Sequence, residues 1–296
     1  MVGLSYATVN FGTSPGSTMS DQDQGRDNKA HWNEQSRRWT ATAPKGKAPD
    51  DNFNQMIIAE AGIRPGEAVL DIASGTGNPA VSIALAMDGK GSVTCTDLMP
   101  RMLEAVHERA ENLSLSIMRY VGADMLALPF AEGSFDCVTC RFGLMFPGDR
   151  VAAAREVLRV LKPGGRVAYM VWGPYEENPP FVVPRRAVAK FLGTDEGPVP
   201  PRHSLGDSGA LADILKGAGF DRVEERELRY RNRVEDAADY VSRGLKRSFA
   251  KQVEGLSEDR FAALCDAVVE SWAPYLEEGI LQVPNFARLG LGFRAA

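Results

Sequence analysis

The sequence predicts an α/β protein with a doubly wound, mostly parallel sheet and an α-helical cap. Short apolar, β-rich runs alternate with helical runs between residues 66 and 172, which is the pattern of right-handed βαβ crossovers. One of the predicted strands, residues 68–72, runs directly into a glycine loop that opens a helix. Residues 234–277 then carry two or three amphipathic helices, which we interpret as the cap.

The expected elements follow in order along the chain. Two helices, at 30–40 and 52–61, precede the sheet. Strands are expected at 68–72, 92–96, 117–121, 135–140 and 166–172, with helices between them at 79–87, 99–110 and 150–161. A turn at 162–165 precedes the fifth strand, and the Pro- and Gly-rich residues 173–205 predict a loop-heavy insertion with a short helix. The chain closes with a helix at 211–218, a strand at 222–228 and a last strand drawn from 280–283 and 287–293.

These patterns divide the chain into three segments. Residues 1–28 are rich in Gly, Ser, Asp and Gln and predict a flexible N-terminal extension, in which Met19 is a second candidate start. Residues 29–175 hold the N-terminal helices and the core with the glycine loop. Residues 176–296 are expected to supply a substrate-side loop, the helical cap and the last strands of the sheet.

Composition and charge narrow the class of partner. The 296-residue chain has 34 Lys and Arg against 39 Asp and Glu, a net charge of −5, which supplies no general attraction toward nucleic acid or anionic lipid. No apolar run approaches the roughly 20 residues that cross a bilayer. We therefore expect a small-molecule substrate, no nucleic acid and no membrane insertion, with a homodimer as a further hypothesis. Three of the four cysteines fall in predicted buried strands, which indicates a reducing, cytoplasmic compartment.

The stretch from Asp71 to Ala80 is the most informative part of the chain. Gly75 and Gly77 would let the backbone approach a ligand closely, and the start of the helix offers unpaired N–H groups to an anion. The spacing Gly75-x-Gly77-x-x-Ala80 formally matches a dinucleotide fingerprint. However, a carboxylate at Asp71 repels a diphosphate, whereas it suits a ligand with an ammonium and a sulfonium, such as S-adenosylmethionine.

A second carboxylate, Asp97, ends the next predicted strand. It lies twenty residues after Gly77, about where a doubly wound fold places an acid over the ribose hydroxyls. A carboxylate can accept a hydrogen bond from each hydroxyl, and Leu98 and Met99 would pack on the adenine. The alternative is that Asp97 caps the helix that begins near Pro100.

The order of the segments resembles one enzyme class. Asp71-x-x-x-Gly75-x-Gly77 is similar to the glycine loop of class I S-adenosylmethionine-dependent methyltransferases. Residues 122–130, 134–138 and 156–166 resemble the family's adenine-side segment, its fourth strand, and the helix and turn before its fifth. The pattern covers roughly residues 65–175 and is most similar to the ubiquinone/menaquinone-biosynthesis type and its small-molecule relatives.

The resemblance implies a Rossmann-like methyltransferase fold, S-adenosylmethionine as cofactor, and methyl transfer (EC 2.1.1.-) as the activity. It assigns Asp124 to the adenine amino group. The expected cofactor-binding residues are Asp71, Ala73, Ser74, Gly75, Gly77, Asp97, Leu98, Met99, Asp124, Met125 and Arg141. The chain departs from the family at Ala73, where many members have Gly; an alanine is tolerated there if its backbone keeps a negative φ.

The methyl acceptor has no signature in the cap region, and we expect a small apolar or aromatic metabolite. The candidate pocket residues, each of which would equally suit core packing, are Trp32, Trp39, Phe142, Met145, Trp172 and Tyr175. Residues 178–181 spell Asn-Pro-Pro-Phe, with which adenine-N6 and glutamine methyltransferases bind the target nitrogen. Here the motif follows the fifth predicted strand instead of the fourth, so we interpret it as a proline-rich loop.

Methyl transfer needs little acid–base help, because the donor carries its own leaving group. No catalytic residue is therefore assigned, and no metal site is expected. His31 and His203 lie in segments that could fold over the cleft and are the two candidate bases; the alternative is that both are solvated loop histidines. Two other functions stay open: an NAD(P)-dependent oxidoreductase, which Asp71 disfavours, and a non-catalytic nucleotide-binding module.

Overall fold

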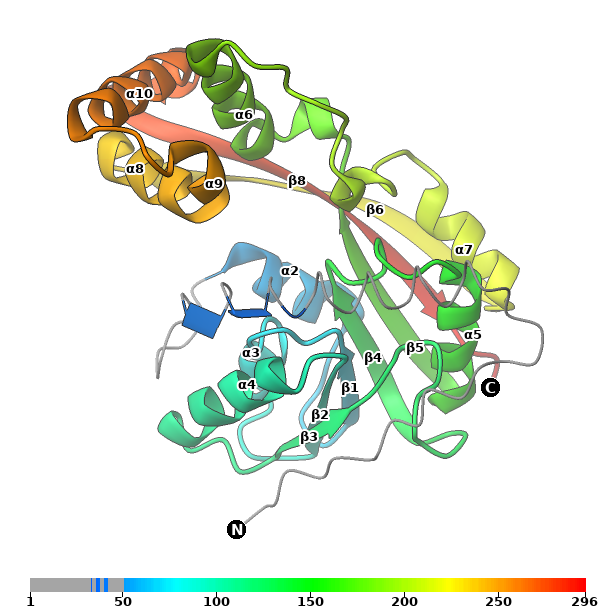
Figure 1. Ribbon diagram of the computed structural model, residues 1–296. Coiled ribbons are helices and arrows are strands. Elements are labelled where there is room, and N and C mark those ends of the chain that lie inside the picture. Colours follow the sequence, from blue (N-terminus) through cyan, green and yellow to red (C-terminus); the bar gives the residue numbers. More distant parts are fainter. Residues whose placement is uncertain (1–32, 34–35, 38–39, 42–50) are drawn as a thin grey trace, which may run out of the picture. The chain divides into compact units, whose positions relative to one another are not determined.

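The computed structural model describes residues 33, 36–37, 40–41 and 51–296, which form two compact units (Figure 1). The first unit holds the described residues up to Val171 together with 209–226 and 289–296, and the second holds 172–208 and 227–288. Trp32, Trp39 and His31 lie outside the described residues, as do most of the helix predicted at 30–40 and all of the predicted extension 1–28. The division into domains at residue 175 stays a prediction.

A sheet with a parallel core forms the first unit. The strands β1 (Ala68–Ile72), β2 (Ser92–Asp97), β3 (Met118–Gly122), β4 (Phe135–Arg141) and β5 (Leu161–Trp172) pair in parallel in the order β3-β2-β1-β4-β5. The long strands β8 (Ile280–Phe293) and β6 (Arg222–Val234) continue this order. Strand order reverses between β1 and β4, which is where ligands bind in open α/β sheets. The predicted fold class is confirmed.

The helices of the first unit are α2 (Asn52–Ala61), α3 (Ala80–Ala86), α4 (Pro100–Asn112), α5 (Arg150–Val160) and α7 (Ala210–Ala218). Each lies within two or three residues of its predicted position. None of the helices among the described residues is long and apolar enough to cross a bilayer.

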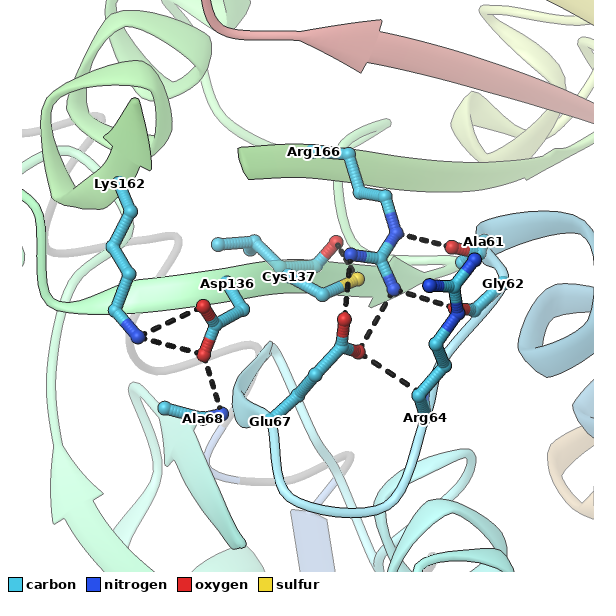
Figure 2. Close-up of polar contacts among 10 residues, drawn as sticks. Ala61, Gly62, Arg64, Glu67, Ala68, Asp136, Cys137, Lys162 and Arg166 are labelled. Carbon is cyan, nitrogen blue, oxygen red and sulfur yellow. Dashed lines mark hydrogen bonds and ion pairs between the residues drawn. The ribbon is translucent and has the colours of Figure 1, made fainter. Parts of the chain in front are cut away.

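Arg166, near the amino end of the sheet, holds the C-terminus of α2 (Figure 2). Its Nη2 donates to the carbonyl of Gly62 at 2.7 Å, and its Nε donates to the carbonyl of Ala61. The Glu67 carboxylate accepts from the same guanidinium at 2.8 and 3.0 Å. These bonds satisfy helix-end carbonyls that have no partner within α2, so α2 is held to the strands at this end.

The second unit is mainly helical. It contains α6 (Pro179–Leu192), α8 (Ala237–Ser248), α9 (Ala250–Val253) and α10 (Glu258–Ser271), the short 3₁₀ turns η1 (Tyr175–Glu177), η2 (Pro201–His203) and η3 (Ala273–Tyr275), and the two-residue strand β7 (Leu276–Glu277). Its apolar core includes Val188, Leu245, Leu264, Trp272 and Leu281.

Two local predictions were wrong. The Asn-Pro-Pro-Phe segment is the start of α6, a helix of 14 residues, and not a loop, because prolines are tolerated in the first turn of a helix. The turn expected at 162–165 is an irregularity inside β5, where the register with β4 shifts between Phe135 and Cys137. Gly164 adopts a φ of 73° within it.

Candidate functional site

The glycine loop connects β1 to α3. Gly75 and Gly77 both adopt positive φ, 53° and 98°, which favours glycine. A Cβ added at Gly75 would meet nothing within 4 Å, whereas one at Gly77 would come within 2.6 Å of Val106 Cγ2 and 2.8 Å of Val81 Cγ2. Open space for a ligand therefore lies beside Gly75, while Gly77 is required for packing against α3 and α4.

Ala73, at the start of this loop, has a φ of 53°. The condition under which an alanine is tolerated at this position, a negative φ, is therefore not met. A left-handed alanine costs roughly 1–2 kcal/mol, and Phe142, which follows β4, adopts a similar φ of 59°. The two loops touch, because a Cβ on Gly143 would lie 2.6 Å from Ala73 Cβ. Left-handed backbone thus occurs at the ends of two adjacent strands, beside the glycine loop.

Asp71 lies on β1 with no exposed surface. Its Oδ1 accepts a hydrogen bond of 2.6 Å from the Thr139 hydroxyl on β4, but no group among the described residues donates to its buried Oδ2. Burial raises the pKa of the carboxyl from 3.8 to about 7. A buried carboxylate oxygen without a donor is costly, and a cationic ligand would satisfy it.

Asp97, the last residue of β2, links the glycine loop to α4. Its Oδ2 accepts from the N–H of Gly75 and its Oδ1 from the N–H of Met99, both at 2.9 Å. Met99 is the N-cap residue of α4, so this bond reaches the residue before the first turn, and the helix-capping alternative is wrong. Each oxygen keeps a second lone pair, so the same carboxylate can also accept from ribose hydroxyls. Burial raises the pKa of Asp97.

Asp124 follows β3 in a tight turn. Its Oδ1 accepts from the N–H of Leu126 at 2.9 Å, and Asp124 forms a β-bridge with Ala127. Asp71, Asp97 and Asp124 thus lie at or just beyond the carboxyl ends of three neighbouring strands. The other predicted cofactor residues, Ser74, Leu98, Met99 and Met125, lie in the same three connections.

Arg141, the last residue of β4, is held by α2. Its Nη2 donates to Asp51 Oδ2 at 2.6 Å and its Nη1 to Asn54 Oδ1 at 2.7 Å. The guanidinium also lies 5.0 Å from the centre of the Phe142 ring. Its charge is therefore neutralised by the carboxylate of the N-cap residue of α2, a partner that the sequence did not reveal. Met145, another predicted pocket residue, is buried.

The sequence analysis did not identify the side chains whose hydrogen bonds support the glycine loop and the helix after it. Arg109, which is 2% exposed on α4, donates through Nη1 to the Thr76 carbonyl and to Asn78 Oδ1, both at 3.1 Å. Asn54 on α2 donates to Ser82 Oγ at 3.0 Å. A signal for Arg109 was present, because it shares the apolar face of its helix with Met102 and Val106.

The remaining candidates, Trp172, Tyr175 and His203, lie in the second unit. His203 is 7% exposed, so the alternative of a solvated loop histidine was wrong for this residue. The described residues bring no three His, Cys, Asp or Glu side chains together in a way that could hold a metal ion.

Comparison with known proteins matches the model of the ubiE/COQ5 methyltransferase family to residues 50–179. The ubiquinone/menaquinone biosynthesis C-methyltransferase of Francisella philomiragia is 38% identical over 194 residues, which cover 60% of this chain and 75% of that protein. Its counterpart in Klebsiella pneumoniae is 37% identical over 188 residues, with the same coverage. An uncharacterised Mycobacterium tuberculosis protein is 42% identical over 117 residues, so the chain spans about two fifths (41%) of its length.

Solved structures share the fold. A putative methyltransferase from Bacillus halodurans aligns with a TM-score of 0.52 at 19% identity, over 83% of this chain and 100% of that one. The [4+2]-cyclase SpnF aligns with a TM-score of 0.54 at 19% identity, over 86% of each chain. At such identities the likeness concerns the fold alone.

Proposed function

The chain belongs to the ubiE/COQ5 methyltransferase family, and we propose that it transfers the methyl group of S-adenosylmethionine to a small apolar or aromatic metabolite. The observation that carries this proposal is the buried Asp71 Oδ2, which has no hydrogen-bond donor among the described residues, beside a glycine loop with open space at Gly75.

The charges of the site suit this cofactor. S-adenosylmethionine carries an ammonium and a sulfonium, and three carboxylates stand at the ends of β1, β2 and β3. Arg141, the arginine at the end of β4, is already paired with Asp51. A diphosphate finds no free cation among these residues, which argues against the NAD(P)-dependent alternative. None of the relatives and structures described above is named as an oxidoreductase.

Each residue has a proposed task. Asp71 would pair with the ammonium through Oδ2, while Thr139 orients the carboxylate from the other side. Asp97 would accept from the ribose hydroxyls and Asp124 from the adenine amino group. The bound cofactor supplies a methyl group on a sulfonium, whose sulfur is the leaving group of the reaction. The protein therefore mainly positions the two reactants and excludes water.

The proposed class of methyl acceptor is based on the names of two relatives. Those from Francisella philomiragia and Klebsiella pneumoniae are named for carbon methylation in ubiquinone and menaquinone biosynthesis. This naming supports an aromatic acceptor. A cytoplasmic location and a homodimer stay predictions.

Calorimetry with S-adenosylmethionine and S-adenosylhomocysteine tests the cofactor. We expect micromolar binding, weakened at least tenfold in Asp97→Asn and unchanged in the exposed control Asp213→Asn on α7. Incubation with a metabolite extract, followed by mass spectrometry, should then reveal a compound that gains one CH2 unit. Binding of NADH without binding of S-adenosylmethionine would overturn the proposal, and cofactor binding without any methylated product would favour a non-catalytic module.

A further inference from the structure

A hollow of about 250 Å³ lies beside α6 in the second unit. It opens between α6, the end of α10 and the turns η1 and η3, and Figure 1 shows α6 and α10 next to each other. All of its lining residues belong to this unit. None of them is a candidate cofactor or acceptor residue, so the proposed function gives this hollow, which we call the α6 hollow, no task.

Apolar side chains form much of the α6 hollow. Pro179, Val183 and Ala187 line it and follow one another at intervals of four residues, so they share one face of the helix. Tyr275 from η3 also lines it, with its ring 5.4 Å from that of the buried Trp272. At roughly 30 Å³ per non-hydrogen atom, the share that a water molecule takes in the liquid, the α6 hollow holds on the order of eight such atoms. It is therefore large enough for a short alkyl chain with a head group.

Two cations of α6 also line the α6 hollow. Arg186 and Lys190 are exposed and four residues apart, so they are neighbours on the helix surface. Arg186 is compensated, because its Nη2 donates to the Glu176 carboxylate at 2.8 and 3.0 Å and its Nε lies 3.5 Å from Glu196 Oε1. No carboxylate in the described part of the chain pairs with the Lys190 ammonium. One positive charge at this site is therefore left without a counter-ion.

The position of Lys190 near the end of α6 has a second physical explanation. The helix ends at Leu192, and a cation in the last turn is favourable because the helix C-terminus carries a partial negative charge. This effect accounts for a basic residue at Lys190. It does not account for a second cation one turn earlier, since like charges at this spacing destabilise a helix, or for the apolar hollow beside both. An anionic ligand with an apolar part accounts for all three features.

We propose that the α6 hollow binds a small amphiphilic carboxylate, whose alkyl chain of about six carbon atoms fills the space and whose carboxylate pairs with the Lys190 ammonium. Burial of the chain against the apolar side chains supplies the main driving force. The single uncompensated ammonium selects a singly charged anion over a neutral or cationic head group. Because no residue of the α6 hollow is a candidate cofactor residue, this inference is independent of the proposed function.

Three probes with one alkyl chain and different head groups test this assignment. Hexanoate, hexan-1-ol and hexylammonium are titrated into the full-length, ¹⁵N-labelled protein at low ionic strength, and the backbone amide shifts in NMR spectra give both the affinity and the place of binding. We expect the amides of α6 and η3 to shift. Hexanoate should bind about threefold more tightly than hexan-1-ol and about tenfold more tightly than hexylammonium, because the ion pair is exposed and screened by salt.

Variants then separate the charge from the space. Lys190→Gln should remove the preference for hexanoate, whereas Lys190→Arg, which keeps the charge, and Lys251→Gln, a control on α9, should both retain it. Val183→Phe should weaken all three probes by at least about fivefold, because the larger ring fills the α6 hollow. Absence of a saturable shift with hexanoate, equal affinities of hexanoate and hexylammonium, or a preference that survives Lys190→Gln would overturn the assignment.

Discussion

The protonation of Asp71 connects stability to cofactor binding, and Asp71→Asn separates the two effects. Asparagine keeps an oxygen that can accept from Thr139, but it carries no charge. The wild-type carboxyl has a pKa of about 7 in the folded protein, against its ordinary value of 3.8 in the unfolded chain. The folded state therefore binds more protons, and the free energy of unfolding falls as the pH rises from 3.8 to about 7.

The magnitude follows from the size of this shift. Each pH unit within the window changes the free energy of unfolding by about 1.4 kcal/mol, so between pH 5 and pH 8 the wild type should lose about 3 kcal/mol relative to the variant. A constant cost of burying the asparagine amide applies at both pH values and cancels from this difference. The variant should thus gain stability relative to the wild type at alkaline pH.

Urea unfolding of the cofactor-free proteins at both pH values measures this difference. Calorimetry at pH 8 should show the opposite trend for function, since S-adenosylmethionine should bind at least about tenfold more weakly to the variant through loss of a charge-assisted contact. Parallel stability curves for the two proteins across this pH range would refute the reasoning that Asp71 is buried and neutral without a ligand.

Three further substitutions test the loops around the site. Gly77→Ala should lower the free energy of unfolding by roughly 1–3 kcal/mol, measured in urea, because the new methyl group collides with Val106 and the φ is positive; an unchanged midpoint would be inconsistent with this packing. Ala73→Gly should leave stability equal or raise it by up to about 1 kcal/mol, since it relieves a left-handed alanine, and a clear loss would speak against the positive φ. Thr139→Val removes the donor that lowers the pKa of Asp71, so the pH midpoint of cofactor binding, followed by calorimetry, should move upward; a downward move would contradict the hydrogen bond.

Local patterns were sufficient for much of the candidate site. The alternation of strands and helices, the loop between Asp71 and Ala80, and the acids after successive strands are all visible within short windows of sequence. Parallel strands bring their carboxyl ends to one edge of the sheet, so the relative positions of Asp71, Asp97 and Asp124 followed once the fold class was recognised.

Contacts between residues that are distant in the sequence could not be predicted from such short windows. Arg141 finds Asn54 and Asp51 at separations of 87 and 90 residues, and Arg109 reaches the glycine loop from 31 and 33 residues away. Neither composition nor spacing predicts which residues these two arginines bind. The left-handed backbone of Ala73 has no local signal either, because an alanine by itself favours a negative φ.

The sequence by itself determined the fold class, the family and the acids at the ends of three strands, because these depend on hydrophobic periodicity and on a short motif. Only the tertiary structure decided that Gly75 borders open space while Gly77 packs against α4, that Asp71 is buried with a raised pKa, and that His203 is buried. Burial, desolvation and steric contact are properties of what surrounds a residue, and those surroundings come from parts of the chain that are distant in sequence.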